Sequence, residues 1–146
     1  MNVAISGHFT VARPPAEAFG LFTPRGEERL VAGWRPRFPA PATDDTAPGT
    51  VFETDAHGRT TTWVVVERAE SSRIRYARVV PGETAGTVTV DVAGCGPAGD
   101  EHSDVTVTYE LTALTASAVE PLRGFTARYP EMMRQWADAI AASLTR

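Results

Sequence analysis

The chain of 146 residues contains no lysine, and all fourteen of its basic residues are arginines. Schiff-base catalysis, the anchoring of pyridoxal phosphate and the phosphate-binding loop of many nucleotide hydrolases each require a lysine amine. The absence of lysine therefore excludes these three chemistries. A bias toward arginine, together with abundant alanine, glycine and proline, is typical of a protein from a GC-rich bacterial genome.

Cysteine is nearly absent, since Cys95 is the only one in the chain. A single cysteine forms no internal disulfide, which agrees with a reducing cytoplasm, and we expect it to be a small buried or turn residue. No apolar run approaches the about 20 residues of a membrane span. Residues 1–5 have neither the charged region nor the cleavage site of a signal peptide. We expect a cytoplasmic protein that does not insert into membranes.

Charge and histidine spacing exclude further classes of partner. A net charge of −4 argues against nucleic acid, because binding to nucleic acid depends on neutralising phosphates. His8, His57 and His102 are far apart and lack the spacing of zinc ligands. We therefore expect no nucleic acid, no metal and no cofactor. The length and the 42% hydrophobic content predict one globular domain over residues 1–146.

The order of apolar patterns predicts the fold class. Alternating apolar residues predict six strands, over residues 2–11, 50–55, 59–68, 73–80, 85–93 and 102–114. Spacings of three and four predict two short helical segments, over 16–22 and 27–32, and a long apolar helix over 122–144. Strands in series followed by a helix indicate an α+β fold with an antiparallel sheet. A curved sheet wrapped around one helix can leave a cavity between them.

Prolines mark two irregular places. Residues 35–49 contain four prolines and are expected to form a loop. Pro130 lacks a backbone donor, so it should kink the last helix or start a second segment there. Both places are candidate gates to a cavity.

Three motifs have simpler explanations than catalysis. The glycine pattern of residues 94–99 resembles a dinucleotide site, but a strand follows it instead of a helix, so we expect a hairpin loop within 94–100. Residues 102–104 (His-Ser-Asp) have the residue types of a hydrolytic triad, yet neighbours on a strand point to opposite faces. Glu53 and Asp55 share one strand face, which should be solvated if Phe52 faces the core, and a register slip of one residue would reverse this.

The candidate cavity residues share an inward strand face or the apolar face of the last helix. Arg78 lies on the apolar face of its strand, where a guanidinium must snorkel, pair with a carboxylate or meet a polar ligand group. Three tyrosines can offer hydroxyls, and the other candidates suit both a core and a pocket wall. The predicted ligand-binding residues are Trp34, Phe52, Trp63, Tyr76, Arg78, Tyr109, Phe125, Tyr129, Met133 and Trp136.

Four segments carry a resemblance to a known family: residues 9–19 (FTVARPPAEAF), 33–36 (GWRP), 62–65 (TWVV) and 105–111 (VTVTYEL). They resemble the SRPBCC superfamily, the START and Bet v 1-like group with the helix-grip fold. The resemblance implies a cavity between the sheet and the last helix. Family members bind lipids, sterols, polyketides or plant metabolites, some cyclise or aromatise polyketides, and others, like the activator of the Hsp90 ATPase, act through protein contacts. The family has no common catalytic motif, so no residue here inherits a role.

Our first hypothesis is that the chain binds a small hydrophobic molecule, such as a lipid, a polyketide-like compound or an aromatic metabolite, with Tyr76, Arg78 and Tyr109 orienting its polar end. The first alternative is an enzyme like the polyketide cyclases and aromatases. It requires a titratable group in the cavity, and the sequence predicts no inward-facing Asp, Glu or His. The second alternative is a protein-interaction domain like the Hsp90 activator, with an exposed apolar patch. A homodimer and catalytic competence are left open.

Overall fold

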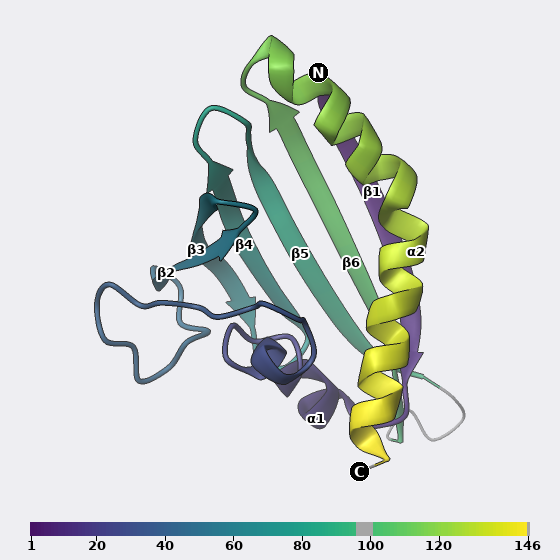
Figure 1. Ribbon diagram of the computed structural model, residues 1–146. Helices are drawn as coiled ribbons and strands as arrows, with labels where there is room; N and C mark the ends of the chain where they lie inside the picture. Colours follow the sequence, from purple (N-terminus) through teal and green to yellow (C-terminus); the bar gives the residue numbers. More distant parts are fainter. Residues whose placement is uncertain (96–100, 146) are drawn as a thin grey trace.

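Six strands form one antiparallel sheet in the order β1-β6-β5-β4-β3-β2 in the computed structural model, which describes residues 1–95 and 101–145 (Figure 1). The strands are β1 (Asn2–Val11), β2 (Val51–Ala56), β3 (Arg59–Ala69), β4 (Arg73–Val80), β5 (Thr84–Cys95) and β6 (His102–Ala113). Strands β2 to β6 follow one another as neighbours, and β1 pairs with β6, from Asn2 opposite Thr112 to Val11 opposite Ser103. The predicted antiparallel sheet is confirmed.

The helices are α1 (Pro15–Gly20), the 3-10 turns η1 (Gly26–Arg29) and η2 (Ala116–Ala118), and α2 (Val119–Leu144). Helix α1 begins at Pro15, where a missing backbone donor and a fixed φ suit the first turn. It packs on β5 and β6, while α2 lies over β1 (Figure 1). The α+β fold with two short helices after the first strand and a long C-terminal helix is therefore confirmed. No helix in the described residues is long and apolar enough to cross a membrane.

Close contact between α2 and β1 depends on Gly7. A Cβ atom at this position would lie 2.5 Å from Cγ of Met133 and 3.1 Å from Cε2 of Tyr129. Real Cβ atoms do not approach neighbours so closely, so a larger residue would push the helix away from the strand. The glycine thus sets where α2 touches the sheet.

Helix α2 continues through Pro130, so the alternative of a second segment is wrong. Pro130 is exposed, and its missing backbone hydrogen bond therefore lies on the solvent side of the helix. Helices bend around a core with their convex side toward water, and Figure 1 shows that the axis of α2 changes direction along its length. The predicted kink thus takes the form of a bend in one helix.

Strand β5 extends two residues farther than predicted, because Gly94 and Cys95 pair with Ser103 and His102 on β6. The rest of the glycine-rich loop, residues 96–100, lies outside the described residues. Ser103 is buried, whereas His102 is exposed. The hydroxyl of Ser103 donates to the carbonyl of Arg13 at 2.8 Å, so residues 102–104 form a strand entrance as predicted.

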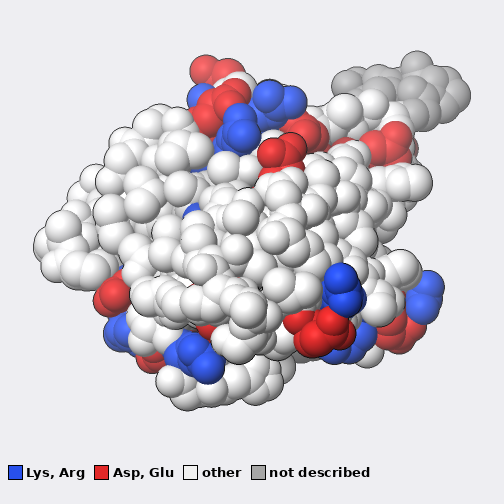
Figure 2. Space-filling view, turned by 90° about the horizontal axis from the view of Figure 1, so that it is seen from above, with Lys and Arg blue, Asp and Glu red and all other residues white. Residues whose placement is uncertain are grey.

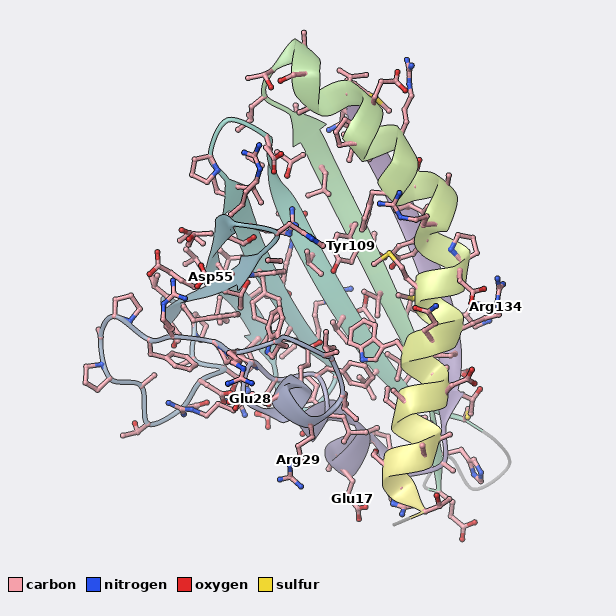
Figure 3. All side chains as sticks on the ribbon, viewed as in Figure 1. Glu17, Glu28, Arg29, Asp55, Tyr109 and Arg134 are labelled. Atoms are coloured by element: carbon pink, nitrogen blue, oxygen red, sulfur yellow. The ribbon has the colours of Figure 1, made fainter. Side chains whose placement is uncertain are left out.

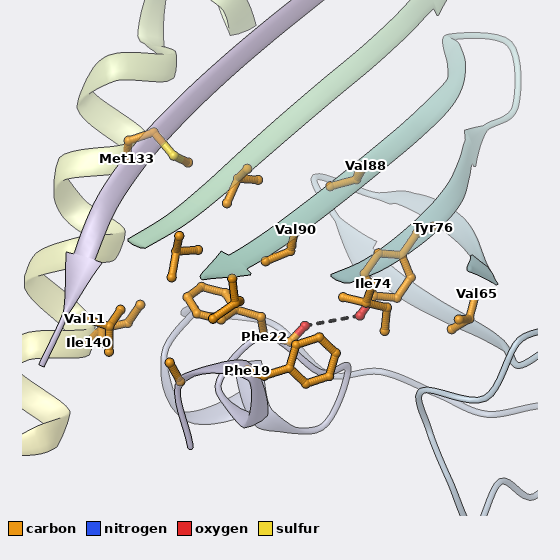
Figure 4. Close-up of a cluster of buried hydrophobic side chains, with 14 of the residues drawn as sticks. Val11, Phe19, Phe22, Val65, Ile74, Tyr76, Val88, Val90, Met133 and Ile140 are labelled. Carbon is orange, nitrogen blue, oxygen red and sulfur yellow. Dashed lines mark hydrogen bonds between the residues drawn. The ribbon is translucent and has the colours of Figure 1, made fainter. Parts of the chain in front are cut away.

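The core lies between the sheet, α1 and α2, and Figure 4 shows its labelled side chains. Phe22, which follows α1, is fully buried, and the hydroxyl of Tyr76 donates to its backbone carbonyl at 3.2 Å. On β2, Phe52 is 1% exposed, while Asp55 is exposed and bonds to Arg37. The predicted register, with Phe52 inward and the carboxylates of β2 outward, is confirmed.

Charged residues form exposed pairs on the surface, such as Arg59 with Glu83 at 3.1 Å and Arg73 with Asp91 at 2.6 Å. Seen from above, charged side chains gather near the edges of the molecule around a broad uncharged area (Figure 2). Exposed ion pairs contribute little to stability, typically about 0–1 kcal/mol each. The fold is therefore held mainly by its apolar core.

Candidate ligand cavity

A cavity of about 290 Å³ lies between the inward face of the sheet, α2 and the segment that begins with η1. This volume is at the lower end of small-molecule sites, which span roughly 300–1,000 Å³. Its walls are mostly aromatic and aliphatic. They consist of Glu27, Leu30, Val31, Ala32, Trp34, Phe52, Trp63, Tyr76, Val88, Val90, Tyr109, Met132, Met133, Gln135 and Trp136.

The floor of the cavity is one row of side chains across three strands. Tyr76 on β4 lies opposite Val88 on β5, and Val88 lies opposite Tyr109 on β6. Residues that pair directly point to the same face of a sheet, so these three side chains stand side by side. Valine is the smallest of them, so space remains above it between the two tyrosine rings.

One wall is a cluster of aromatic rings. Phe52 and Trp63 are stacked with centroids 5.7 Å apart and an angle of 1° between their planes. Tyr76 meets both rings edge-on at 5.8 Å, and Trp34 meets Trp63 edge-on at 5.5 Å. The indole N–H of Trp63 donates to Oγ1 of Thr54 at 3.0 Å. Because this polar atom is already bonded, the wall presents apolar ring surface to the cavity.

The segment that carries Glu27 is positioned by Gly26. A Cβ atom on Gly26 would overlap the carbonyl oxygen of Gly20, so only glycine lets η1 begin this close to the end of α1. The backbone N–H of Gly26 also donates to Oγ1 of Thr23 at 3.0 Å. This tight turn brings Glu27 to the cavity wall.

Glu27 is a carboxyl group inside an apolar site. The residue is half-buried and lines the cavity beside Leu30 and Val31. Burial raises the pKa of Glu27 well above its usual value of 4.5. Among the described residues, no cation and no side-chain hydrogen bond offsets this burial. The raised pKa therefore favours the protonated form of the carboxyl group.

Tyr109 is the one of the three predicted tyrosines whose hydroxyl is not used by the fold in the described residues. The hydroxyl of Tyr76 donates to the carbonyl of Phe22, and that of Tyr129 donates to the carbonyl of Val107 at 2.7 Å. Burial raises the pKa of Tyr109 to about 12, so its hydroxyl stays protonated at neutral pH. Figure 3 shows Tyr109 over the sheet, whereas labelled charged residues such as Arg134 point outward.

Arg78 does not line the cavity. Its guanidinium lies 5.5 Å from the ring centroid of Trp63, and its Nη1 donates to Oγ1 of Thr84 at 3.1 Å. Burial lowers the pKa of Arg78. No ion pair joins it to a carboxylate within the described residues. The guanidinium is thus stabilised away from water by an aromatic ring, an arrangement that the sequence did not suggest.

Seven of the ten residues predicted to line a cavity do so: Trp34, Phe52, Trp63, Tyr76, Tyr109, Met133 and Trp136. Besides Arg78, the exceptions are Phe125 and Tyr129, whose rings pack against Tyr109 at 5.1 and 5.7 Å. These two rings also pack against each other at 5.7 Å, and Tyr129 is 1% exposed.

Glu27 is the important residue that the sequence interpretation missed, and the expectation of no inward carboxylate is wrong. A signal existed, since Glu27, Leu30 and Val31 have helical spacing and all line the cavity. Gln135 was missed as well, because it lies beside Trp136 on the polar border of the apolar stripe.

Replacing Glu27 by glutamine is expected to increase the free energy of unfolding at about pH 7 and to change it little at about pH 4. The folded protein retains a proton on Glu27 where the unfolded chain has lost it, so this contribution is full below the usual pKa of 4.5 and declines as the pH rises toward the folded pKa. Glutamine does not titrate, so its contribution to stability does not decline as the pH rises. Urea denaturation at both pH values measures the difference, with the exposed neighbour Glu28→Gln as control. A loss of stability at neutral pH in Glu27→Gln would show that the carboxylate is ionised and stabilising.

No family model matches the chain. No curated protein matches its sequence.

Solved structures share its fold. A START superfamily protein from Mycobacterium smegmatis superimposes with a TM-score of 0.65 at 14% identity, over 96% of this chain and 95% of that one. Norcoclaurine synthase from Thalictrum flavum, solved with dopamine and hydroxybenzaldehyde, has a TM-score of 0.64 at 14% identity. The similarity covers 99% of this chain and 87% of that one.

DynU16, a protein of the dynemicin biosynthetic locus, has a TM-score of 0.63 at 20% identity over 96% of this chain. The chain spans 48% of the length of DynU16. At these identities the similarity concerns the fold. This chain has the helix-grip fold, which it shares with these solved structures.

Proposed function

We propose that the chain binds a small, mainly apolar and aromatic molecule in the cavity above Val88. The observation that carries this proposal is a cavity already open within a packed aromatic wall. The hydrogen bond from the indole of Trp63 to Thr54 and the bond from Tyr76 to Phe22 hold the rings in place without a ligand. Such preorganisation lowers the entropic cost of binding.

A proton-transfer enzyme of the polyketide cyclase or aromatase type is a second candidate. The specific observation in its favour is Glu27, because a titratable group with a shifted pKa in the cavity is what this alternative requires. One protein of the same fold, DynU16, comes from a biosynthetic locus. Turnover of a candidate substrate that is lost in Glu27→Gln, while ligand affinity is retained, would favour the enzyme over the binding protein.

Filling the cavity tests the proposed site. Val88 is 4% exposed and lies at the centre of the floor, so Val88→Phe should place a ring in the space that the ligand needs. We expect naphthalene to bind the native protein with one site and to bind Val88→Phe at least about tenfold more weakly. All three tryptophans of the chain line the cavity, so their fluorescence reports binding together with calorimetry.

The matched control is Thr87→Phe, which adds a ring to the same strand on the opposite face of the sheet. This variant should keep the affinity of the native protein. Circular dichroism checks that both variants are folded. Equal affinity in folded Val88→Phe would show that naphthalene binds elsewhere.

A further inference from the structure

Three of the seven polar side chains on the cavity wall already have partners within the protein. Tyr76 donates to the carbonyl of Phe22, the indole of Trp63 donates to Thr54, and the indole of Trp34 donates to a backbone carbonyl at 2.7 Å. The groups that remain without a partner in the described residues are therefore informative about the ligand.

Two such groups belong to Glu27 and Tyr109, and both line the cavity. A third unpaired group is the buried indole N–H of Trp136, another lining residue. A tyrosine hydroxyl and an indole N–H can both donate, and a carboxyl group donates when it is protonated. Gln135, the remaining polar side chain of the wall, is exposed to water. The less exposed unpaired groups can thus all donate, and a buried donor without an acceptor is unfavourable.

The protonation state of Glu27 follows from its surroundings. Burial raises its pKa, and the half-buried Arg78 is directed to Trp63 and Thr84 and does not line the cavity. An ionised carboxylate would have no compensating group on this wall. Burial thus favours the neutral, donating form of Glu27, as it does for Tyr109.

The two groups border the same cavity of about 290 Å³. Tyr109 stands directly beside Val88 on its floor. Glu27 on η1 and Tyr109 on β6 therefore reach one small space from two different elements.

We propose that Glu27 and Tyr109 form a pair of hydrogen-bond donors that receives one oxygen atom of the ligand, either a ketone carbonyl or a phenolic oxygen. This inference rests on the proposed function and specifies its ligand class as oxygen-bearing aromatic compounds. An aromatic ring over Val88 would direct its oxygen toward the two donors. A cationic amine fits less well, because it requires Glu27 to ionise in an apolar site.

The test compares three probes that share an apolar body: naphthalene, 2-naphthol and 2-naphthylmethylamine. We expect the native protein to bind 2-naphthol at least about tenfold more tightly than naphthalene, the effect of one or two good hydrogen bonds. Tyr109→Phe should remove most of this preference, measured as the ratio of the affinities for 2-naphthol and naphthalene. Glu27→Leu should do the same, whereas Glu27→Gln, whose amide can donate, should keep part of it.

The outcomes separate the inference from the proposed function. If naphthalene itself does not bind, the cavity is not a ligand site and the proposed function fails. If naphthalene binds but 2-naphthol has no advantage, or if its advantage persists in Tyr109→Phe, the donor pair is wrong while the cavity proposal stands. If 2-naphthylmethylamine binds most tightly and Glu27→Gln abolishes its advantage, Glu27 is a carboxylate that pairs with cations, and the inference is overturned.

Discussion

Gly86→Ala is expected to destabilise the protein by about 3 kcal/mol or more, the range of severe steric overpacking. A Cβ atom on Gly86 would overlap the carbonyl oxygen of Glu110 and lie 2.9 Å from Cα of Leu111. Both atoms belong to the backbone of β6, which pairs with β5 along its whole length. A flexible side chain could rotate away from a new methyl group, but a paired strand cannot move without losing hydrogen bonds.

The midpoint of urea denaturation measures this effect, and Gly20→Ala is its control. Gly20 ends α1, and a Cβ atom added there would have no neighbouring atom within 4 Å, so alanine should be neutral or stabilising by up to about 1 kcal/mol. If Gly86→Ala unfolds at the same urea concentration as the native protein, β5 and β6 are not as close as the structure shows. Glycine within a strand commonly marks such a close approach of two backbones.

Phe52→Ala is expected to cost about 3–5 kcal/mol, as for other buried phenylalanines. Phe52 is 1% exposed and contacts the rings of Trp63, Tyr76, Trp34 and Phe38. It lies on β2, an edge strand that pairs with β3 on one side and has a bridge to Arg37 on the other, so few other contacts hold the aromatic wall together. Since small proteins are stable by only about 5–15 kcal/mol, this loss is a large part of the total.

The neighbouring Val51→Ala is the matched control, because Val51 is on the same strand and is 37% exposed. It should cost less than about 1 kcal/mol. Thermal denaturation compares the two variants, and naphthalene affinity should fall in Phe52→Ala at a temperature where it is still folded. If both variants lose equally little stability, the aromatic wall does not depend on the packing of Phe52.

These predictions concern separate properties of the protein. Gly86 and Phe52 determine whether the sheet and the cavity wall form, whereas Glu27 and Tyr109 determine which ligand the cavity prefers. A variant of the first kind should lower stability at every pH. The Glu27→Gln variant should change stability only where the unfolded chain has lost the proton that the folded protein retains.

The sequence alone determined the strands and the faces of their side chains. Strand β4 has the predicted bounds, and its residues Ile74, Tyr76 and Val80 are buried as the alternation indicated. Alternation with a period of two is a local property, so a burial pattern can be read without knowing which strands pair. The long apolar stripe of α2 was recognisable for the same reason.

Only the tertiary structure decided which residues line the cavity. Tyr129 and Met133 belong to the same stripe, but Tyr129 packs against Tyr109 and donates to the carbonyl of Val107, whereas Met133 lines the cavity. The spacing of Glu27 with Leu30 and Val31 indicates a shared face, but only the close approach of Gly26 to Gly20 brings that face to the cavity wall. Whether a tyrosine hydroxyl is free depends on which backbone carbonyl lies near it. Such contacts between residues far apart in the chain have no signal in local sequence patterns.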